Sequence, residues 1–212
     1  MIRQLLDHAI DLEWREENPA RTVKRFKTGE GRHTWTEDEI ASYYRAHKLG
    51  TIAHTAMTLM LYTGAARSDA VALGWANIHG DRLVYRRKKT RRVSDTVVNI
   101  PIAPQLREVL EMLPRDAFTF LQTQRGTGRS PNGLGNDMRR WCDDAGLSMC
   151  TSHGLRRAMA RRLAEAGATT REIMATGGWK TSKEVDRYTS DMDREHAATS
   201  GFNKMLKGLE GE

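Results

Sequence analysis

The 212-residue sequence contains few cysteines, few aromatic residues and no long apolar run. Its two cysteines, Cys142 and Cys150, do not have the spacing of a zinc-binding motif, and a disulfide framework is not expected from so few. No apolar stretch approaches the roughly 20 residues that a membrane span needs, and the first residues do not resemble a signal peptide. We therefore expect an intracellular protein in a reducing compartment, with no membrane partner and no metal centre.

Two phosphate-handling patterns are also missing. The sequence has no glycine-rich Walker-type loop that would hold a nucleoside triphosphate. It also lacks an acidic cluster like that of a two-metal nuclease. We therefore expect no cofactor, and any phosphate chemistry is predicted to use side chains alone.

The charge of the chain is unbalanced in two places. The net charge is +7, and residues 82–92 ("RLVYRRKKTRR") hold seven basic side chains and no acidic one. Residues 153–162 ("HGLRRAMARR") add four arginines and a histidine, again without an acid. Either run alone is equally well explained as a solvated surface. Together they favour a polyanionic partner.

Periodicity and capping signals predict a mainly helical fold with a small sheet. Thr36 and Glu39 form a capping-box pattern, with Trp35 and Ile40 placed as a hydrophobic staple. Residues 76–101 predict three short strands, with a turn at Gly80 and a second bend over 88–94. Helices are expected at residues 37–48, 52–63, 104–113, 131–145, 152–166, 170–176 and 182–188.

The chain divides into four segments. Residues 1–17 have a helical apolar rhythm that ends before Pro19. Residues 18–34 are basic and aperiodic and are interpreted as a linker, so the first helix is expected to be the end of a preceding domain. Residues 35–192 form the main predicted domain, and residues 193–212 predict one more helix.

Three sets of polar residues are candidates for a site that binds an anion. Arg67 follows a glycine bend at the start of a short helix, where free N–H groups suit an anion. Asp69 could orient the guanidinium of Arg67. An ordinary surface ion pair between Arg67 and Asp69 is the alternative explanation. His153 and Arg156 are three residues apart and share a helix face, although this pattern is common. Lys89 lies at a bend between strands, but composition does not separate it from Lys88.

The segments "TGAARSDAVAL", "KKT", "HGLRR", "GGWKTS" and "VDRYT" occur in an order that resembles the catalytic domain of tyrosine recombinases, the phage integrase family. The resemblance covers residues 34–192. It implies an α+β, mainly α fold, in which a helical domain carries a small three-stranded antiparallel sheet. It also implies that residues 1–17 end the truncated core-binding domain that precedes catalysis in that family.

The resemblance assigns roles to the candidate residues. Arg67 and Arg156 would hold the non-bridging oxygens of the scissile phosphate, a task that suits the planar and always charged guanidinium. Lys89 would protonate the leaving 5′ oxygen. His153 would be a general acid/base or a donor to the phosphate.

Two further positions complete the resemblance. Tyr188 would be the nucleophile and form a 3′-phosphotyrosyl link. Its phenolate costs about 4 kcal/mol at pH 7 from an ordinary pKa near 10, so the surrounding cations would have to lower that cost. Trp179 stands where many members have a second histidine; its indole N–H can donate a hydrogen bond but cannot shuttle a proton.

The resemblance also implies partners. The substrate would be double-stranded DNA with specific recombination sites, on which free monomers assemble into a homotetramer. An accessory directionality factor is a further expected partner. The protein would act in the cytoplasm of a prokaryotic cell, at the nucleoid. Phe202, Met205, Leu206 and Leu209 are predicted to dock the tail on a neighbouring protomer. The residues expected to contact DNA are Arg86, Arg87, Lys88, Arg91, Arg92 and Arg157.

Other functions remain open at this point. A type IB topoisomerase or a resolvase-type recombinase would use the same chemistry. A catalytically silent DNA-binding module would use the basic runs for phosphate contacts alone.

Overall fold

The computed structural model describes residues 2–23, 33–88, 96–189, 198–199, 201–203 and 205–206, with side chains given up to residue 186 in the helix that ends at Thr189. The chain forms two compact units, Met1–Gly31 and Arg32–Glu212. No helix in these ranges is both long enough and apolar enough to cross a bilayer.

The first unit consists of helix α1 (Ile2–Asp11) and a 3-10 turn, η1 (Pro19–Arg21). The helix ends earlier than the predicted limit at residue 17. Glu13 adopts a left-handed φ of 59°, and its N–H donates to the carbonyl of Ile10. The Trp14 N–H reaches the carbonyl of Ala9, which completes a Schellman-type ending that the sequence signals did not reveal.

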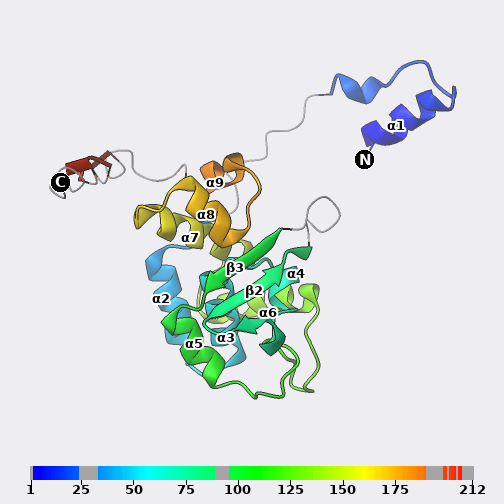
Figure 1. Cartoon of the computed structure of the whole chain (residues 1–212). Coiled ribbons are helices and arrows are strands. Elements are labelled where there is room, and N and C mark those ends of the chain that lie inside the picture. Colours follow the sequence, from blue (N-terminus) through cyan, green and yellow to red (C-terminus); the bar gives the residue numbers. More distant parts are fainter. Residues whose placement is uncertain are drawn as a thin grey trace. The chain divides into compact units, whose positions relative to one another are not determined.

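The second unit is mainly helical, as expected (Figure 1). The predicted capping box is present: Thr36 Oγ accepts from the Glu39 N–H at 3.2 Å, and Glu39 accepts from the Thr36 N–H at 2.8 Å. Helices and 3-10 turns in this unit are α2 (Glu37–Ala46), α3 (Ile52–Thr63), α4 (Arg67–Ala70), η2 (Trp75–Asn77), α5 (Pro104–Glu111), α6 (Pro131–Asp144), α7 (Ser152–Glu165), α8 (Thr170–Gly177) and α9 (Ser182–Thr189).

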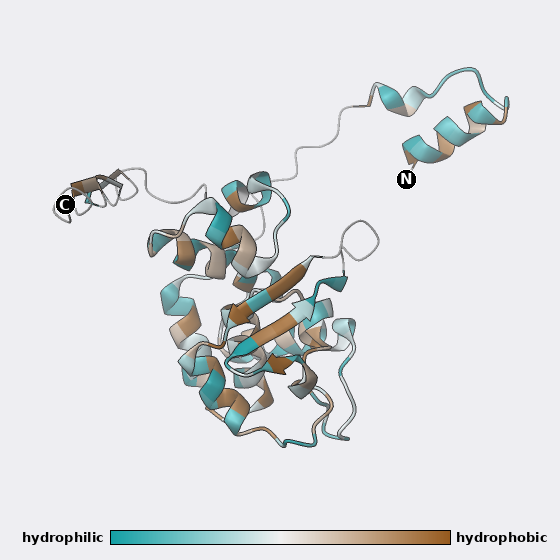
Figure 2. Cartoon of the chain, viewed as in Figure 1, coloured by the Kyte–Doolittle hydropathy of each residue, from teal (hydrophilic) through white to brown (hydrophobic). Residues whose placement is uncertain are grey.

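The predicted three-stranded sheet is also present. Strands β1 (Ile78–His79), β2 (Arg82–Arg86) and β3 (Val97–Pro101) pair antiparallel in the order β1-β2-β3. Alternate residues of β2 and β3 are buried, so one face of the sheet packs on the core, and apolar segments are visible along both strands in Figure 2.

The core surrounds α3, in which nine of twelve residues are buried. This helix packs against α7 and α5, and it ends at Gly64, whose φ of 60° permits the left-handed turn into α4. A second apolar cluster joins α7, α8 and α9 and includes Met159, Ile173 and Val185. The first cluster includes Ala65, Ala70 and Leu155, which flank the predicted site residues at the beginnings of α4 and α7.

Candidate active site

The beginnings of three helices meet at a cavity of about 210 Å³. Arg67 is the first residue of α4, Pro131 the first of α6 and Ser152 the first of α7, and all three line it. The positive ends of the α6 and α7 helix dipoles face this region and favour an anion. The full lining is Ala65, Ala66, Arg67, Ser68, Pro131, Ser152, His153 and Arg156.

A second cavity, of about 180 Å³, also has Arg67, Ser152 and His153 in its lining. The structure thus brings together Arg67, His153 and Arg156, three of the predicted catalytic residues, although 86 positions separate Arg67 from His153 in the sequence. Arg67 and His153 are exposed, whereas Arg156 is 5% exposed. An anion entering the cavity would therefore meet the buried guanidinium of Arg156 and the exposed guanidinium of Arg67.

Arg156 is held by contacts on two sides. Its Nη1 donates to the carbonyl of Gly64, at the end of α3. On the other side, its Cζ lies 4.0 Å from the centroid of the Trp179 ring, a cation–π contact. Because the guanidinium is fixed between α3 and the segment after α8, its remaining donors have a defined direction.

Trp179, which was predicted as a site residue, is buried in the second apolar cluster at 4% exposure. The same cluster includes Val185 of α9, so α9 is anchored beside Trp179. Tyr188 belongs to the last turn of α9, three residues after Val185. The side chain of Tyr188 lies outside the described part of the structure, and its predicted role stays a prediction.

The guanidinium of Arg67 lies against a glycine of α6. A Cβ built on Gly135 would overlap Nη1 of Arg67 and lie 3.0 Å from its Cζ. Among the described residues, no side chain or carbonyl forms a hydrogen bond or ion pair with this guanidinium.

Asp69 has a different partner from the one predicted. It was expected to orient Arg67, but its Oδ1 accepts from the Lys88 backbone N–H at 2.9 Å. Its Oδ2 lies 3.6 Å from Nε of Arg87, and Nη1 of Arg87 donates to the carbonyl of Gly178 at 2.7 Å. We call Asp69 and Arg87 the buried clamp, because the pair connects α4, the end of β2 and the residue before Trp179.

Two arginines of the predicted DNA-binding set, Arg87 and Arg157, are buried in this structure. Arg87 is 8% exposed, and its guanidinium contacts Asp69 and the carbonyl of Gly178, so its contact with DNA stays a prediction. Arg157 is also 8% exposed, because its position in α7 turns toward the interior. Arg86 and Lys88 are exposed as expected. Lys89, Arg91 and Arg92 lie outside the described residues.

Arg139 is a cavity residue that sequence reasoning missed. From α6 it donates to the carbonyls of Leu147, Ser148 and Cys150, at 2.8, 2.7 and 2.8 Å. These bonds fix the loop that leads into α7, and Arg139 lines the second cavity. Nothing in the local sequence "DMRRWCDD" distinguishes it from Arg140, because its partners come from a loop that only the fold places.

The family model described as "Phage integrase family" matches residues 34–195. No curated protein sequence matches the chain.

Several solved structures resemble the chain. A lambda integrase dimer bound to a COC' core site has a TM-score of 0.76 at 22% identity, over 91% of this chain and 58% of that chain. A lambda integrase tetramer bound to a Holliday junction gives the same values. XerA recombinase has a TM-score of 0.67 at 16% identity, over 96% of this chain and 74% of that one. The chain thus spans less than two thirds of the lambda integrase chains in these two complexes.

Proposed function

This chain belongs to the phage integrase family, and we propose that it is the catalytic part of a site-specific DNA recombinase that cuts and rejoins duplex DNA through Tyr188. The observation that carries the proposal is the cavity that Arg67, His153 and Arg156 line together at the beginnings of α6 and α7. Such an arrangement suits one phosphodiester of a DNA backbone.

The two arginines would bind the non-bridging oxygens of the scissile phosphate. Attack on a phosphodiester increases the negative charge on these oxygens, and donors already in place stabilise that charge without reorganisation. Arg156 is held by Gly64 and Trp179, so it would be the fixed donor. Arg67, over Gly135, would complete the grip from the opposite helix.

Tyr188 would attack the phosphorus through its phenol oxygen. A bond forms between that oxygen and phosphorus, the bond from phosphorus to the 5′ oxygen breaks, and a 3′-phosphotyrosyl link results. In this proposal His153 accepts the phenol proton, and Lys89 gives a proton to the departing 5′ oxygen. The neighbouring positive charges would lower the free-energy cost of the phenolate.

The proposed chemistry exchanges one phosphate ester for another. The energy of the broken DNA bond stays in the phosphotyrosyl link, so a 5′ hydroxyl of a second strand can reseal the break without ATP. The same donors serve the reverse step. We expect no requirement for a metal ion in this transfer.

The partners follow from the same proposal. The substrate would be duplex DNA carrying specific recombination sites, and the chain would be monomeric when free and tetrameric on DNA. The likeness to a lambda integrase tetramer bound to a Holliday junction supports this assembly. An accessory protein that sets the direction of recombination is a further expectation from the family.

A trapping experiment tests the function. Nicked duplexes with a randomised sequence are incubated with the full chain, and covalent complexes are isolated after denaturation and sequenced to identify the site. A short strand lost beside the nick prevents religation, so the phosphotyrosyl complex accumulates. We expect Tyr188→Phe to bind the selected duplex with unchanged affinity and to give no covalent complex.

Two alternatives give different results in this assay. A silent DNA-binding module forms no covalent complex with any duplex, and that outcome would reject the proposal. A topoisomerase-like enzyme forms the complex but relaxes supercoiled plasmid without exchanging strands between two sites. Strand exchange between two copies of the selected site therefore separates recombination from relaxation.

A further inference from the structure

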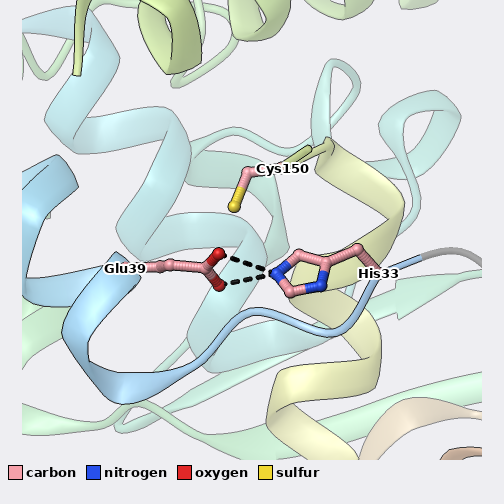
Figure 3. Close-up of side chains that lie close together, drawn as sticks. All are labelled: His33, Glu39 and Cys150. Carbon is pink, nitrogen blue, oxygen red and sulfur yellow. Dashed lines mark hydrogen bonds and ion pairs between the residues drawn. The ribbon is translucent and has the colours of Figure 1, made fainter. Parts of the chain in front are cut away.

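Three side chains with different metal-binding atoms meet beside the beginning of α7. His33 precedes α2, Glu39 belongs to the first turn of α2, and Cys150 lies two residues before α7 (Figure 3). Their nitrogen, oxygen and sulfur atoms all lie within 4.8 Å of one another. Nε2 of His33 is 2.8 and 2.7 Å from the two carboxylate oxygens of Glu39.

We propose that His33, Glu39 and Cys150 bind a divalent transition-metal ion, with Zn²⁺ as the best fit. One imidazole, one carboxylate and one thiolate form a ligand set that zinc accepts, and water would fill the fourth position. Bonds of about 2.0–2.3 Å in a tetrahedron place ligand atoms roughly 3.3–3.8 Å apart. Side-chain rotations that move the ligand atoms of His33, Glu39 and Cys150 by about 1 Å would bring them to that spacing.

The backbone around the three residues is well fixed. Glu39 accepts the Thr36 N–H at 2.8 Å, so its carboxylate already has a partner that orients it. Trp35 donates through Nε1 to the carbonyl of Thr151 at 2.8 Å, which joins the segment of His33 to that of Cys150. A Cβ on Gly154 would collide with the carbonyl oxygen of His33 at 2.5 Å, so the two segments are in close contact.

Charge and access also favour an ion at this cluster. A carboxylate and a thiolate together carry two negative charges, which a divalent cation compensates. Cys150 is buried, whereas the side chains of His33 and Glu39 are 32% and 23% exposed, so an ion can enter from solvent. Without an ion, burial and the nearby Glu39 raise the pKa of Cys150 to about 12, and the thiol keeps its proton.

The ion would have a structural task. It would join the segment that leads into α2 to the residue three positions before His153, and so hold the beginning of α7 in place. This inference does not depend on the proposed recombinase chemistry. Cysteine spacing could not reveal the cluster, because Cys150 lies far along the sequence from His33 and Glu39.

Cobalt binding to the full chain tests the proposal without any activity measurement. The purified protein is treated with a chelator, dialysed and titrated with Co²⁺, which reports thiolate coordination through a near-ultraviolet charge-transfer band. We expect one equivalent of Co²⁺ to produce the band and Zn²⁺ to remove it by displacement. Cys150→Ser should abolish the band, and Cys142→Ser, at the other buried cysteine, should retain it.

A second variant covers the case in which Cys150→Ser fails to fold. His33→Ala removes a partly exposed ring and should weaken Co²⁺ binding at least tenfold while circular dichroism stays unchanged. Absence of the band in the wild-type chain would overturn the proposal, and the cluster would then be a His33–Glu39 ion pair beside a protonated thiol. A band that survives Cys150→Ser would overturn it as well.

Discussion

Gly135 leaves room for the guanidinium of Arg67 against α6. The Arg67 side chain crosses α6 at a position where any Cβ would overlap its Nη1. In a helix interior glycine is unfavourable by about 1 kcal/mol relative to alanine. The position therefore favours alanine for helix stability and glycine for access of Arg67 to the cavity, and the two requirements can be separated by mutation.

Gly135→Ala is expected to leave the protein as stable as the wild type or more so, and to slow formation of the covalent complex. A displacement of about 1 Å in a positioned catalytic group can cost roughly 100-fold in rate. Thermal unfolding and the rate of trapping on the nicked duplex measure the two effects.

Gly133→Ala is the matched control, because it lies in the same helix and its Cβ would meet only the Ser130 Oγ, at 3.1 Å. Equal cleavage rates in the two variants would show that Gly135 does not position Arg67.

At the scale of elements, the buried clamp connects three segments that carry predicted site residues. Asp69 lies two residues after Arg67, Arg87 two residues before Lys89, and Gly178 directly before Trp179. The side chains of Asp69 and Arg87 are 0% and 9% exposed, so water solvates neither charge well. Removing one of the two would leave the other charge buried without a partner, which lowers the free energy of unfolding.

Arg87→Ala is expected to lower the free energy of unfolding by about 3–5 kcal/mol, because it leaves the Asp69 carboxylate buried without its cation. Asp69→Asn should cost less, since the amide oxygen can still accept the Lys88 N–H. Urea unfolding measures both values, and Arg86→Ala, at an exposed neighbour, should change stability by less than about 0.5 kcal/mol.

A different result would support the contact with DNA that the sequence predicted for Arg87. If Arg87→Ala unfolded at the wild-type urea concentration but bound DNA more weakly, Arg87 would be a DNA contact and not a clamp residue.

A second connection between elements joins the first turn of α2 to the end of α7. Glu37 accepts from Nη2 of Arg161 at 2.8 Å and from Nε and Nη2 of Arg162 at 2.9 and 2.5 Å. The hydrogen bond from Arg162 is the main reason that the pKa of Glu37 is lowered from its ordinary value of 4.5. The carboxylate is 56% exposed, so screening limits its contribution to below about 1 kcal/mol.

Glu37→Gln should therefore lower the Tm at pH 7 by no more than about 4 °C. A lowered folded-state pKa gives stability that is present above pH 4.5 and lost as the pH falls through the folded-state value. The difference in Tm between wild type and Glu37→Gln should accordingly shrink toward zero in acid.

Thermal unfolding of both proteins from pH 7 to pH 3 measures this dependence. Asp38→Asn is the control for removing a carboxylate at the next position of the same helix turn. A constant difference for Glu37→Gln at all pH values would contradict the ion-pair explanation.

At the scale of the whole molecule, local signals predicted the elements well. The helices expected in residues 37–188 agree with the structure to within two residues at each end, because capping residues such as Thr36 and Gly64 act on their own neighbours in sequence. The three-stranded sheet and the family were also predicted correctly. In contrast, α1 ends at Asp11 because its terminating turn uses Glu13, a residue type without a turn signature.

Long-range contacts were the part that the sequence did not reveal. The burial of Arg87 depends on Asp69 and Gly178, and the role of Arg139 depends on the loop before α7. A basic run in the sequence does not distinguish an arginine on the surface from one inside. For the same reason, the cavity around Arg67 and His153 followed from family resemblance and not from composition.

The tail provides a prediction about assembly. In its described part, Phe202, Met205 and Leu206 are 60%, 51% and 43% exposed, so these apolar side chains are largely unburied in the single chain. Burial of such side chains against a second protomer would contribute roughly 25 cal/mol per Å² of apolar surface. We expect deletion of residues 193–212 to leave the Tm and the trapping of the nicked duplex unchanged, and to reduce tetramers on DNA at least tenfold.

Native mass measurement of complexes on a four-way junction built from two selected sites tests this expectation. Phe202→Ser with Leu206→Ser should reproduce the deletion, because serine removes the apolar contact while leaving the chain length intact. Asn203→Ser, between them in sequence, should assemble normally. If the deleted chain formed tetramers and exchanged strands like the wild type, the tail would have no docking role, and assembly would have to depend on contacts within residues 33–189.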